Sequence, residues 1–105
     1  MAQLLTNKIA AITGGTTGIG RAIAIEYVRQ GAKVAVNHLD NDRGAQEFKQ
    51  MVEEVGEQDK LISVPGDVSV PETSRRLVEE TVRKWGRLDV FVSNAGVCKF
   101  ADFLT

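Results

Sequence analysis

The sequence predicts one α/β domain built on a parallel sheet, in which strands and helices alternate along the chain. Four short runs of apolar residues, rich in β-branched side chains, lie at residues 8–13, 33–37, 61–64 and 88–93. The runs are continuous rather than alternating, which is typical of strands buried on both faces. Three stretches with apolar residues at helical spacing separate them. The order βαβαβαβ is the N-terminal half of a doubly wound, Rossmann-type fold.

Each helical stretch is expected to end at a glycine, which readily terminates a helix: Gly31, Gly56 and Gly86. We expect the strand order 3-2-1-4, with the first two helices on one face of the sheet, the third on the other, and the fourth strand at an exposed edge. The apolar stripes predicted to face the sheet are Ile19, Ala22, Ile23 and Tyr27; Ala45, Phe48, Val52 and Val55; and Leu77, Val78, Thr81, Val82 and Trp85.

Composition narrows the possible partners. The chain of 105 residues has a formal net charge of −1, which gives no reason to expect nucleic acid or an anionic membrane surface as a partner. No apolar run is long enough to span a bilayer. The single cysteine, Cys98, excludes an internal disulfide and a cysteine-rich metal site. We therefore expect a cytoplasmic protein that holds no metal ion.

The stretch TGGTTGIG, residues 13–20, lies where the first strand leads into the first helix. Its spacing, T-G-x-x-x-G-x-G, differs from the dinucleotide fingerprint G-x-G-x-x-G but meets the same demands: a tight turn, close approach of a pyrophosphate, and close packing of helix on strand. The first turn of the helix would direct free N–H groups at the phosphates. The alternative is a glycine-rich loop without a ligand. The cofactor contacts expected here are Gly14, Thr16, Thr17, Gly18, Ile19 and Gly20.

Two further motifs follow at matching distances. Ser93-Asn94-Ala95-Gly96 comes directly after the fourth apolar run, and PGDVS comes directly after the third. With all three motifs in this order, the sequence resembles the short-chain dehydrogenase/reductase family over essentially all of its 105 residues. The resemblance implies an oxidoreductase that binds a dinucleotide cofactor and a small-molecule substrate, and that is a homo-oligomer.

The resemblance also implies roles for individual residues. Asp67 would accept a hydrogen bond from the adenine amino group, with the backbone of Val68 beside it. Asn94 would tie the central strands together and contact the cofactor ribose, while Ala95 and Gly96 would keep the loop low beneath the nicotinamide. The alternatives are an ordinary turn aspartate at Asp67 and a purely structural amide at Asn94.

The choice between the two nicotinamide cofactors is open at the end of the second strand. By resemblance, NAD-selective relatives carry a carboxylate at the position of His38, and NADP-selective relatives carry a basic residue at the position of Leu39 or Thr17. Neither is present. Thr16, Asn37, His38 and Arg43 could instead hydrogen-bond a 2′-phosphate, so we expect use of NAD(P) with a lean towards NADP. The alternative for His38 is a partly exposed histidine at a strand end.

The catalytic groups of the family are not found in these residues. The resemblance implies a tyrosine acid/base with a lysine four residues later, but the one tyrosine, Tyr27, is followed at that distance by Gly31. We expect Tyr27 to be a core residue and residues 1–105 to be the cofactor-binding half of a longer dehydrogenase. The alternative is a non-catalytic dinucleotide-binding module.

A narrower resemblance concerns the substrate. Stretches such as PGDVSVPETSRR and VFVSNAGVCKF resemble sugar dehydrogenases of the family that oxidise the anomeric carbon to a lactone. A sugar or a secondary alcohol is therefore the expected substrate. Val97, Cys98 and Phe100 are the residues expected near it.

Overall fold

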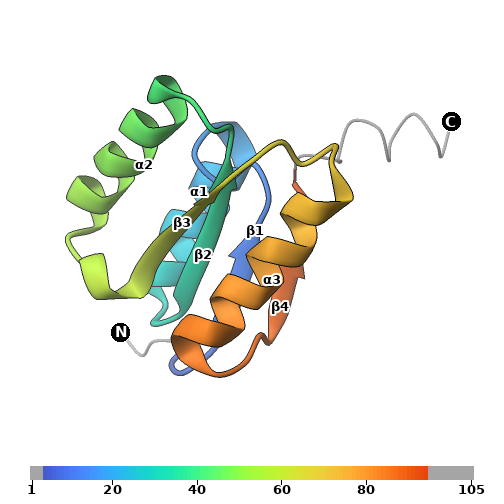
Figure 1. The fold of residues 1–105 in the computed structure, drawn as a ribbon. Helices are drawn as coiled ribbons and strands as arrows, with labels where there is room; N and C mark the ends of the chain where they lie inside the picture. Colours follow the sequence, from blue (N-terminus) through green and yellow to red (C-terminus); the bar gives the residue numbers. More distant parts are fainter. Residues whose placement is uncertain (1–3, 95–105) are drawn as a thin grey trace, which may run out of the picture.

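The computed structural model describes residues 4–94 and contains four strands and three α-helices in the predicted alternation (Figure 1). The elements are β1 (Ile9–Ile12), α1 (Gly18–Arg29), β2 (Lys33–His38), α2 (Asp42–Val55), the short 3₁₀ helix η1 (Gln58–Lys60), β3 (Leu61–Pro65), α3 (Pro71–Trp85) and β4 (Val90–Val92). The expected contacts at Ala95, Gly96, Val97, Cys98 and Phe100 lie outside the described residues.

The four strands form one parallel sheet in the order β3-β2-β1-β4, which confirms the predicted order. Ile9 pairs with Lys33, Ala10 with Val90, and Val34 with Leu61. Because all strands run in the same direction, their carboxyl ends meet at one edge of the sheet. In an open parallel sheet this edge is where ligands bind.

The helices cover the two faces of the sheet as predicted (Figure 1). Ala10, Ile12, Val34 and Val36 pack with α1 and α2 in one core cluster, whereas Ala11, Ala35 and Val64 pack with Leu77 of α3 in the other. The chain moves outward from β1 to β3 and then crosses back to β4. Because crossovers between parallel strands are right-handed as a rule, the reversal of direction at the third one places α3 on the opposite face.

The buried face of α1 differs from the predicted stripe. Ile19 is 66% exposed and Ala22 is also exposed, whereas Ile23 and Tyr27 are half-buried against the core. The fully buried positions are Gly20, Ala24, Ile25 and Val28. The helix is apolar on more than one side, so periodicity alone could not identify the side that touches the sheet.

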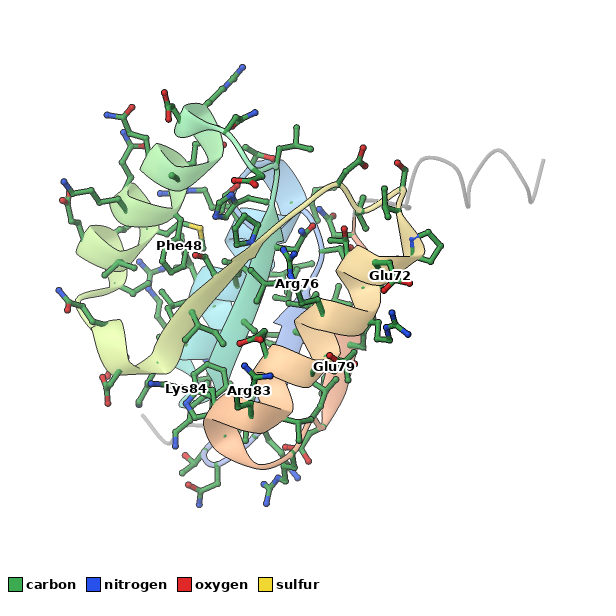
Figure 2. All side chains as sticks on the ribbon, in the orientation of Figure 1. Phe48, Glu72, Arg76, Glu79, Arg83 and Lys84 are labelled. Carbon is green, nitrogen blue, oxygen red and sulfur yellow. The ribbon has the colours of Figure 1, made fainter. Side chains whose placement is uncertain are left out.

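Smaller differences of the same kind occur in the other two helices. In α2, Gly44 and Met51 are buried and Ala45 is exposed. In α3, Thr73 and Thr81 are buried and Val82 is 41% exposed. The Thr81 hydroxyl donates to the Leu77 carbonyl at 2.6 Å, which satisfies it inside the core. The outer side of α3 carries charged side chains, among them Glu72, Glu79 and Arg83 (Figure 2).

The helix ends agree with the sequence prediction. Gly56 and Gly86 adopt left-handed conformations, with φ of 71° and 90°, directly after the last residues of α2 and α3. Each closes its helix by donating its N–H to the carbonyl four residues earlier. At the other end of α2, the Asn41 side chain accepts a hydrogen bond from the Gly44 N–H at 2.7 Å.

Asp89 joins the start of β1 to the loop before β4. Its Oδ2 accepts hydrogen bonds from the Ile9 N–H at 2.9 Å and from Arg87 Nε at 3.1 Å. The pKa of Asp89 lies below its ordinary value of 3.8. The hydrogen bond from the Ile9 N–H lowers it most, and the Arg87 guanidinium lowers it further. This carboxylate therefore stabilises the fold above the unfolded-state pKa, and the stabilisation is lost as the pH falls through the folded-state pKa.

We predict that Asp89→Asn lowers the free energy of unfolding at pH 7, because the amide keeps an acceptor for Ile9 but loses the charge that Arg87 faces. The deficit should shrink as the pH falls from about 3.8, where Asp89 of the unfolded chain takes up its proton, towards the lower folded-state pKa. Urea unfolding of both proteins between pH 7 and 3 measures this difference. A deficit that stays constant across that range would show that the charge of Asp89 does not contribute.

Candidate functional site

The glycine-rich loop after β1 is held over the carboxyl edge of the sheet by backbone hydrogen bonds. The Gly15 N–H donates to the Asn37 carbonyl at 2.9 Å, and the Thr13 N–H donates to the Val92 carbonyl at 3.0 Å. The loop is therefore fixed to β2 on one side and to β4 on the other. This arrangement places the start of α1 at the edge where a ligand would bind.

One glycine of this loop, Gly15, and one in the first turn of α1, Gly20, are required by close packing. A Cβ at Gly20 would overlap the Gly14 carbonyl and lie 2.6 Å from Asn94 Nδ2. A Cβ at Gly15 would lie 2.7 Å from Cγ1 of Val36. Gly18 differs: its φ is +54° and a Cβ there would meet nothing within 4 Å. Gly20 thus brings α1 against the strands, whereas Gly18 leaves open space beside the loop.

The N-terminus of α1 is suited to an anion. Its N-cap residue, Thr17, makes no side-chain capping hydrogen bond, and the first turn of the helix contains no acidic residue. By contrast, α2 is capped by Asn41 and has Asp42 in its first turn. The N–H groups at the start of α1 are therefore not capped by the Thr17 side chain and have no carboxylate in the same turn. A phosphate could act as their acceptor.

Asn37 connects three segments at the carboxyl edge. Its side chain is buried, with 2% of the residue exposed. Oδ1 accepts from the Gly14 N–H at 3.3 Å, and Nδ2 donates to the carbonyls of Val64 at 3.2 Å and Gly66 at 3.0 Å. The amide thus links the glycine-rich loop to the end of β3, and its polar atoms are used within the fold.

Asn94 makes a comparable link on the other side of the loop. Its Nδ2 donates to the Gly14 carbonyl at 3.1 Å, directly after β4. The bond joins the residue after β4 to the loop after β1. Asp67, after β3, accepts from both the N–H and the hydroxyl of Ser69, at 2.9 and 2.7 Å. That geometry is an Asx-type turn, the alternative considered for Asp67.

His38 is buried, so the alternative of a partly exposed strand-end histidine is wrong. Only 6% of the residue is exposed. Nδ1 lies 2.8 Å from the Leu39 carbonyl oxygen, and the ring stacks on Phe48 with a centroid distance of 6.2 Å. Phe48 lies on the side of α2 that faces the sheet (Figure 2). The imidazole is therefore packed between the end of β2 and α2.

A pocket of about 650 Å³ opens over the carboxyl ends of β1 and β2 and extends to the turn after β3. Seven of the predicted contact residues line it: Gly14, Thr16, Thr17, Asn37, His38, Val68 and Asn94. Four described ones do not: Gly18, Ile19, Gly20 and Asp67. The remaining predicted contacts, Ala95 and Gly96, lie outside the described residues.

The first two turns of α2 and its N-cap residue form a wall of this pocket that the motif analysis missed. It consists of Asn41, Arg43, Gly44 and Glu47, of which only Arg43 was considered as a phosphate contact. Glu47 Oε1 lies 3.5 Å from Thr16 Oγ1, and Oε2 lies 3.6 Å from Arg43 Nε. The spacing of Arg43 and Glu47, four residues on a helix, is the one signal that could have placed them on the same side.

The sequence that builds this site matches one family of oxidoreductases. The family model for the short chain dehydrogenase matches residues 8–105, nearly the whole chain. The chain belongs to the short-chain dehydrogenase/reductase family. Within this family it is 56% identical to the L-rhamnose-1-dehydrogenase of Scheffersomyces stipitis over 105 residues, which cover 99% of the chain and 41% of that protein.

Two further relatives of this short-chain dehydrogenase/reductase agree in sequence and fold. An L-rhamnose 1-dehydrogenase (NAD(P)(+)) of a Sphingomonas species is 43% identical, covering 97% of the chain and 39% of that protein. The crystal structure of the glucose dehydrogenase of Caenorhabditis elegans in its apo form is 33% identical with a TM-score of 0.77, covering 87% of the chain and 38% of that structure. The resemblances to the family and to its sugar dehydrogenases are confirmed.

The chain spans about two fifths of the length of these relatives. Within residues 4–94, no helix has both the length and the apolar character that crossing a membrane requires.

Proposed function

We propose that this chain is the cofactor-binding part of an NAD(P)-dependent dehydrogenase that oxidises a sugar or secondary alcohol, and that L-rhamnose is its substrate, oxidised to the lactone. The observation that carries the proposal is the pocket at the carboxyl edge of the sheet, bordered by an uncapped helix N-terminus and reached by a glycine-rich loop. The names of the two rhamnose dehydrogenase relatives support the substrate. We also propose that the protein is a cytoplasmic homo-oligomer, as the resemblance implies.

The residues around the pocket fit an adenine dinucleotide. The pyrophosphate would lie at the start of α1, where Thr16 and Thr17 offer hydroxyl groups and the open space beside Gly18 admits it. The adenine would lie by Asp67 and Val68. The other contacts we propose, on the grounds of the resemblance, are Gly14, Ile19, Gly20, Asn37, His38, Asn94, Ala95 and Gly96.

The bound nicotinamide would accept the hydride. The residues of this chain bind and orient the dinucleotide: the loop of residues 13–17 and α1 fix its phosphates, and the end of β4 leads towards the nicotinamide. No catalytic residue is assigned within these 105 residues, since the tyrosine and lysine implied by the resemblance do not occur at their spacing. Val97, Cys98 and Phe100 are proposed to approach the sugar.

An assay of the full-length protein that contains this chain tests the substrate. L-rhamnose, other aldoses and simple secondary alcohols are offered with NAD and with NADP, and reduction of the nicotinamide is followed by absorbance. We expect the largest kcat/KM with L-rhamnose and a lactone as the product. A larger value with a non-sugar alcohol would contradict the substrate proposal, and dinucleotide binding without any turnover would favour the non-catalytic module.

We predict that His38→Asp in the full-length protein shifts cofactor use towards NAD. A carboxylate at this place would accept hydrogen bonds from the ribose hydroxyls and repel a 2′-phosphate. After screening by salt and rearrangement, a net effect of about 1–3 kcal/mol, or roughly ten- to a hundredfold, is expected in the preference. The measurement is the ratio of kcat/KM for the two cofactors at fixed ionic strength.

His38→Asn is the matched control for that variant, because it shortens the side chain equally without adding a charge. Both variants lose the stacking on Phe48, and His38→Asp should lose more stability than His38→Asn because it also places a charge where 6% of the residue is exposed. If His38→Asp and His38→Asn give the same cofactor ratio as the wild type, the position does not approach the ribose.

A further inference from the structure

The carboxylate of Glu47 reaches the pocket from α2, although no carboxylate occurs at the end of β2. The Glu47 side chain is 26% exposed. Its two oxygens face different partners, with Oε1 at 3.5 Å from Thr16 Oγ1 on the glycine-rich loop and Oε2 at 3.6 Å from Arg43 Nε. An acidic and a basic group therefore stand together in one wall of the pocket.

On the proposed function, this wall faces the adenosine ribose. The pyrophosphate lies at the start of α1 and the adenine lies by Val68, so the ribose between them passes over His38 and Leu39 at the end of β2. Glu47 and Arg43 line the same pocket beside these two residues. A phosphate on the 2′-hydroxyl would come close to both charges, whereas a free hydroxyl would bring no charge.

We propose that Glu47 and Arg43 form a charge pair that determines the cofactor preference. With NAD, the Glu47 carboxylate stays paired with Arg43 and accepts a hydrogen bond from a ribose hydroxyl. With NADP, the Arg43 guanidinium turns from Glu47 to the 2′-phosphate, and Glu47 opposes the phosphate. The inference rests on the proposed function, and it explains the use of both cofactors by a chain with no selector at the strand end.

The contacts of the two side chains allow this exchange. The Arg43 side chain is 87% exposed, and an ion pair of so exposed a group is weak and easily broken. Glu47 is more buried and is in contact with Thr16, so it stays in place when Arg43 moves. The carboxylate is the fixed element of the pair and the guanidinium is the adaptable one.

A structural role for Glu47 is the rival explanation. The carboxylate could simply hold the glycine-rich loop to α2 through Thr16. Glu47→Gln separates the two roles, because the amide keeps an oxygen that accepts from the Thr16 hydroxyl and removes only the charge. Arg43→Gln tests the opposite charge at an exposed position where the fold does not depend on the side chain.

The test compares adenosine 2′,5′-bisphosphate with 5′-AMP, two fragments that differ only in the 2′-phosphate, by calorimetric titration of the full-length protein. We expect Glu47→Gln to raise the affinity for the bisphosphate by about tenfold and to change the affinity for 5′-AMP by less than about threefold. We expect Arg43→Gln to lower the affinity for the bisphosphate by about tenfold. Both changes should shrink at high salt. Glu53→Gln, which makes the same charge change at an exposed position of α2 that does not line the pocket, should leave the affinity ratio unchanged.

The outcomes separate the inference from the proposed function. If Glu47→Gln lowers the affinity for both fragments equally and lowers the Tm, the carboxylate only holds the glycine-rich loop to α2 and the inference is wrong. If neither variant changes the ratio, or if Glu53→Gln changes it as much, the inference is also wrong. If the wild-type protein binds neither fragment and neither dinucleotide, the proposed function itself fails.

Discussion

Replacing Gly20 by valine is expected to disrupt the domain and abolish dinucleotide binding. A Cβ at this position would overlap the Gly14 carbonyl and lie 2.6 Å from Asn94 Nδ2 and 3.0 Å from the Gly14 carbonyl carbon. Two of these atoms belong to the backbone and cannot turn aside. α1 would have to move off the strands, although Ala24 and Val28 of the same face are fully buried against them.

The cost of that movement exceeds that of ordinary overpacking, so we expect a loss of at least about 3 kcal/mol in the free energy of unfolding. Urea unfolding and calorimetric titration with NADP measure the two effects. The matched control is Gly18→Asn. Asparagine tolerates the φ of +54°, and its side chain enters open space.

For Gly18→Asn we expect stability within about 1 kcal/mol of the wild type, with weakened dinucleotide binding because the side chain enters the space proposed for the pyrophosphate. A Gly20→Val protein with wild-type stability and affinity would show that the close packing of α1 on the loop is wrong.

Asn37→Asp is expected to be the second most damaging change, although it alters one atom. The Asn37 amide nitrogen donates to the carbonyls of Val64 and Gly66 in a place where 2% of the residue is exposed. A carboxylate there sets one oxygen against the two carbonyl acceptors, and the Gly14 N–H, which donates to Oδ1 at 3.3 Å, is a neutral donor and not a counter-charge for the buried group. We expect a loss of about 2–4 kcal/mol at pH 7.

The pH dependence identifies the cause of that loss. The folded state should raise the pKa of the new carboxyl group above the ordinary value of about 3.9. The destabilisation should then be smallest below the unfolded-state pKa, where the protonated group can donate one hydrogen bond, and should grow as the pH rises. Asn37→Ala, which loses the donors but adds no charge, should show no such dependence. Equal stability of Asn37→Asp and the wild type at pH 7 would contradict the bridging role of the amide.

The positions of the strands and of the helix ends could be predicted because each has a local signal. Continuous apolar runs mark strands buried on both faces, and Gly56 and Gly86 stop their helices through a conformation that other residues seldom adopt. The buried face of α1 could not be predicted, because the helix carries apolar residues on several sides. The face is selected by Gly20, whose missing side chain lets that side approach the loop.

The residues that the glycine-rich loop contributes to the site could likewise be predicted from the sequence, whereas those that α2 contributes could not. The threonines and glycines of the loop follow one another in a motif. The α2 wall depends on how the helix crosses the end of β2, where a Cβ at Gly44 would lie 2.6 Å from His38 Nδ1. Glycine at this position lets α2 approach, buries the imidazole and brings Glu47 to Thr16, and none of these contacts has a pattern in the sequence.

Hydrogen–deuterium exchange of the full-length protein with and without NADP tests most directly whether the carboxyl edge of this sheet binds the dinucleotide. The predicted result is slower exchange in residues 13–20, 37–44 and 66–68, with no change in residues 49–60, which contain the far end of α2 and η1. Slower exchange confined to segments outside the first three, or no change anywhere at saturating NADP, would contradict the site.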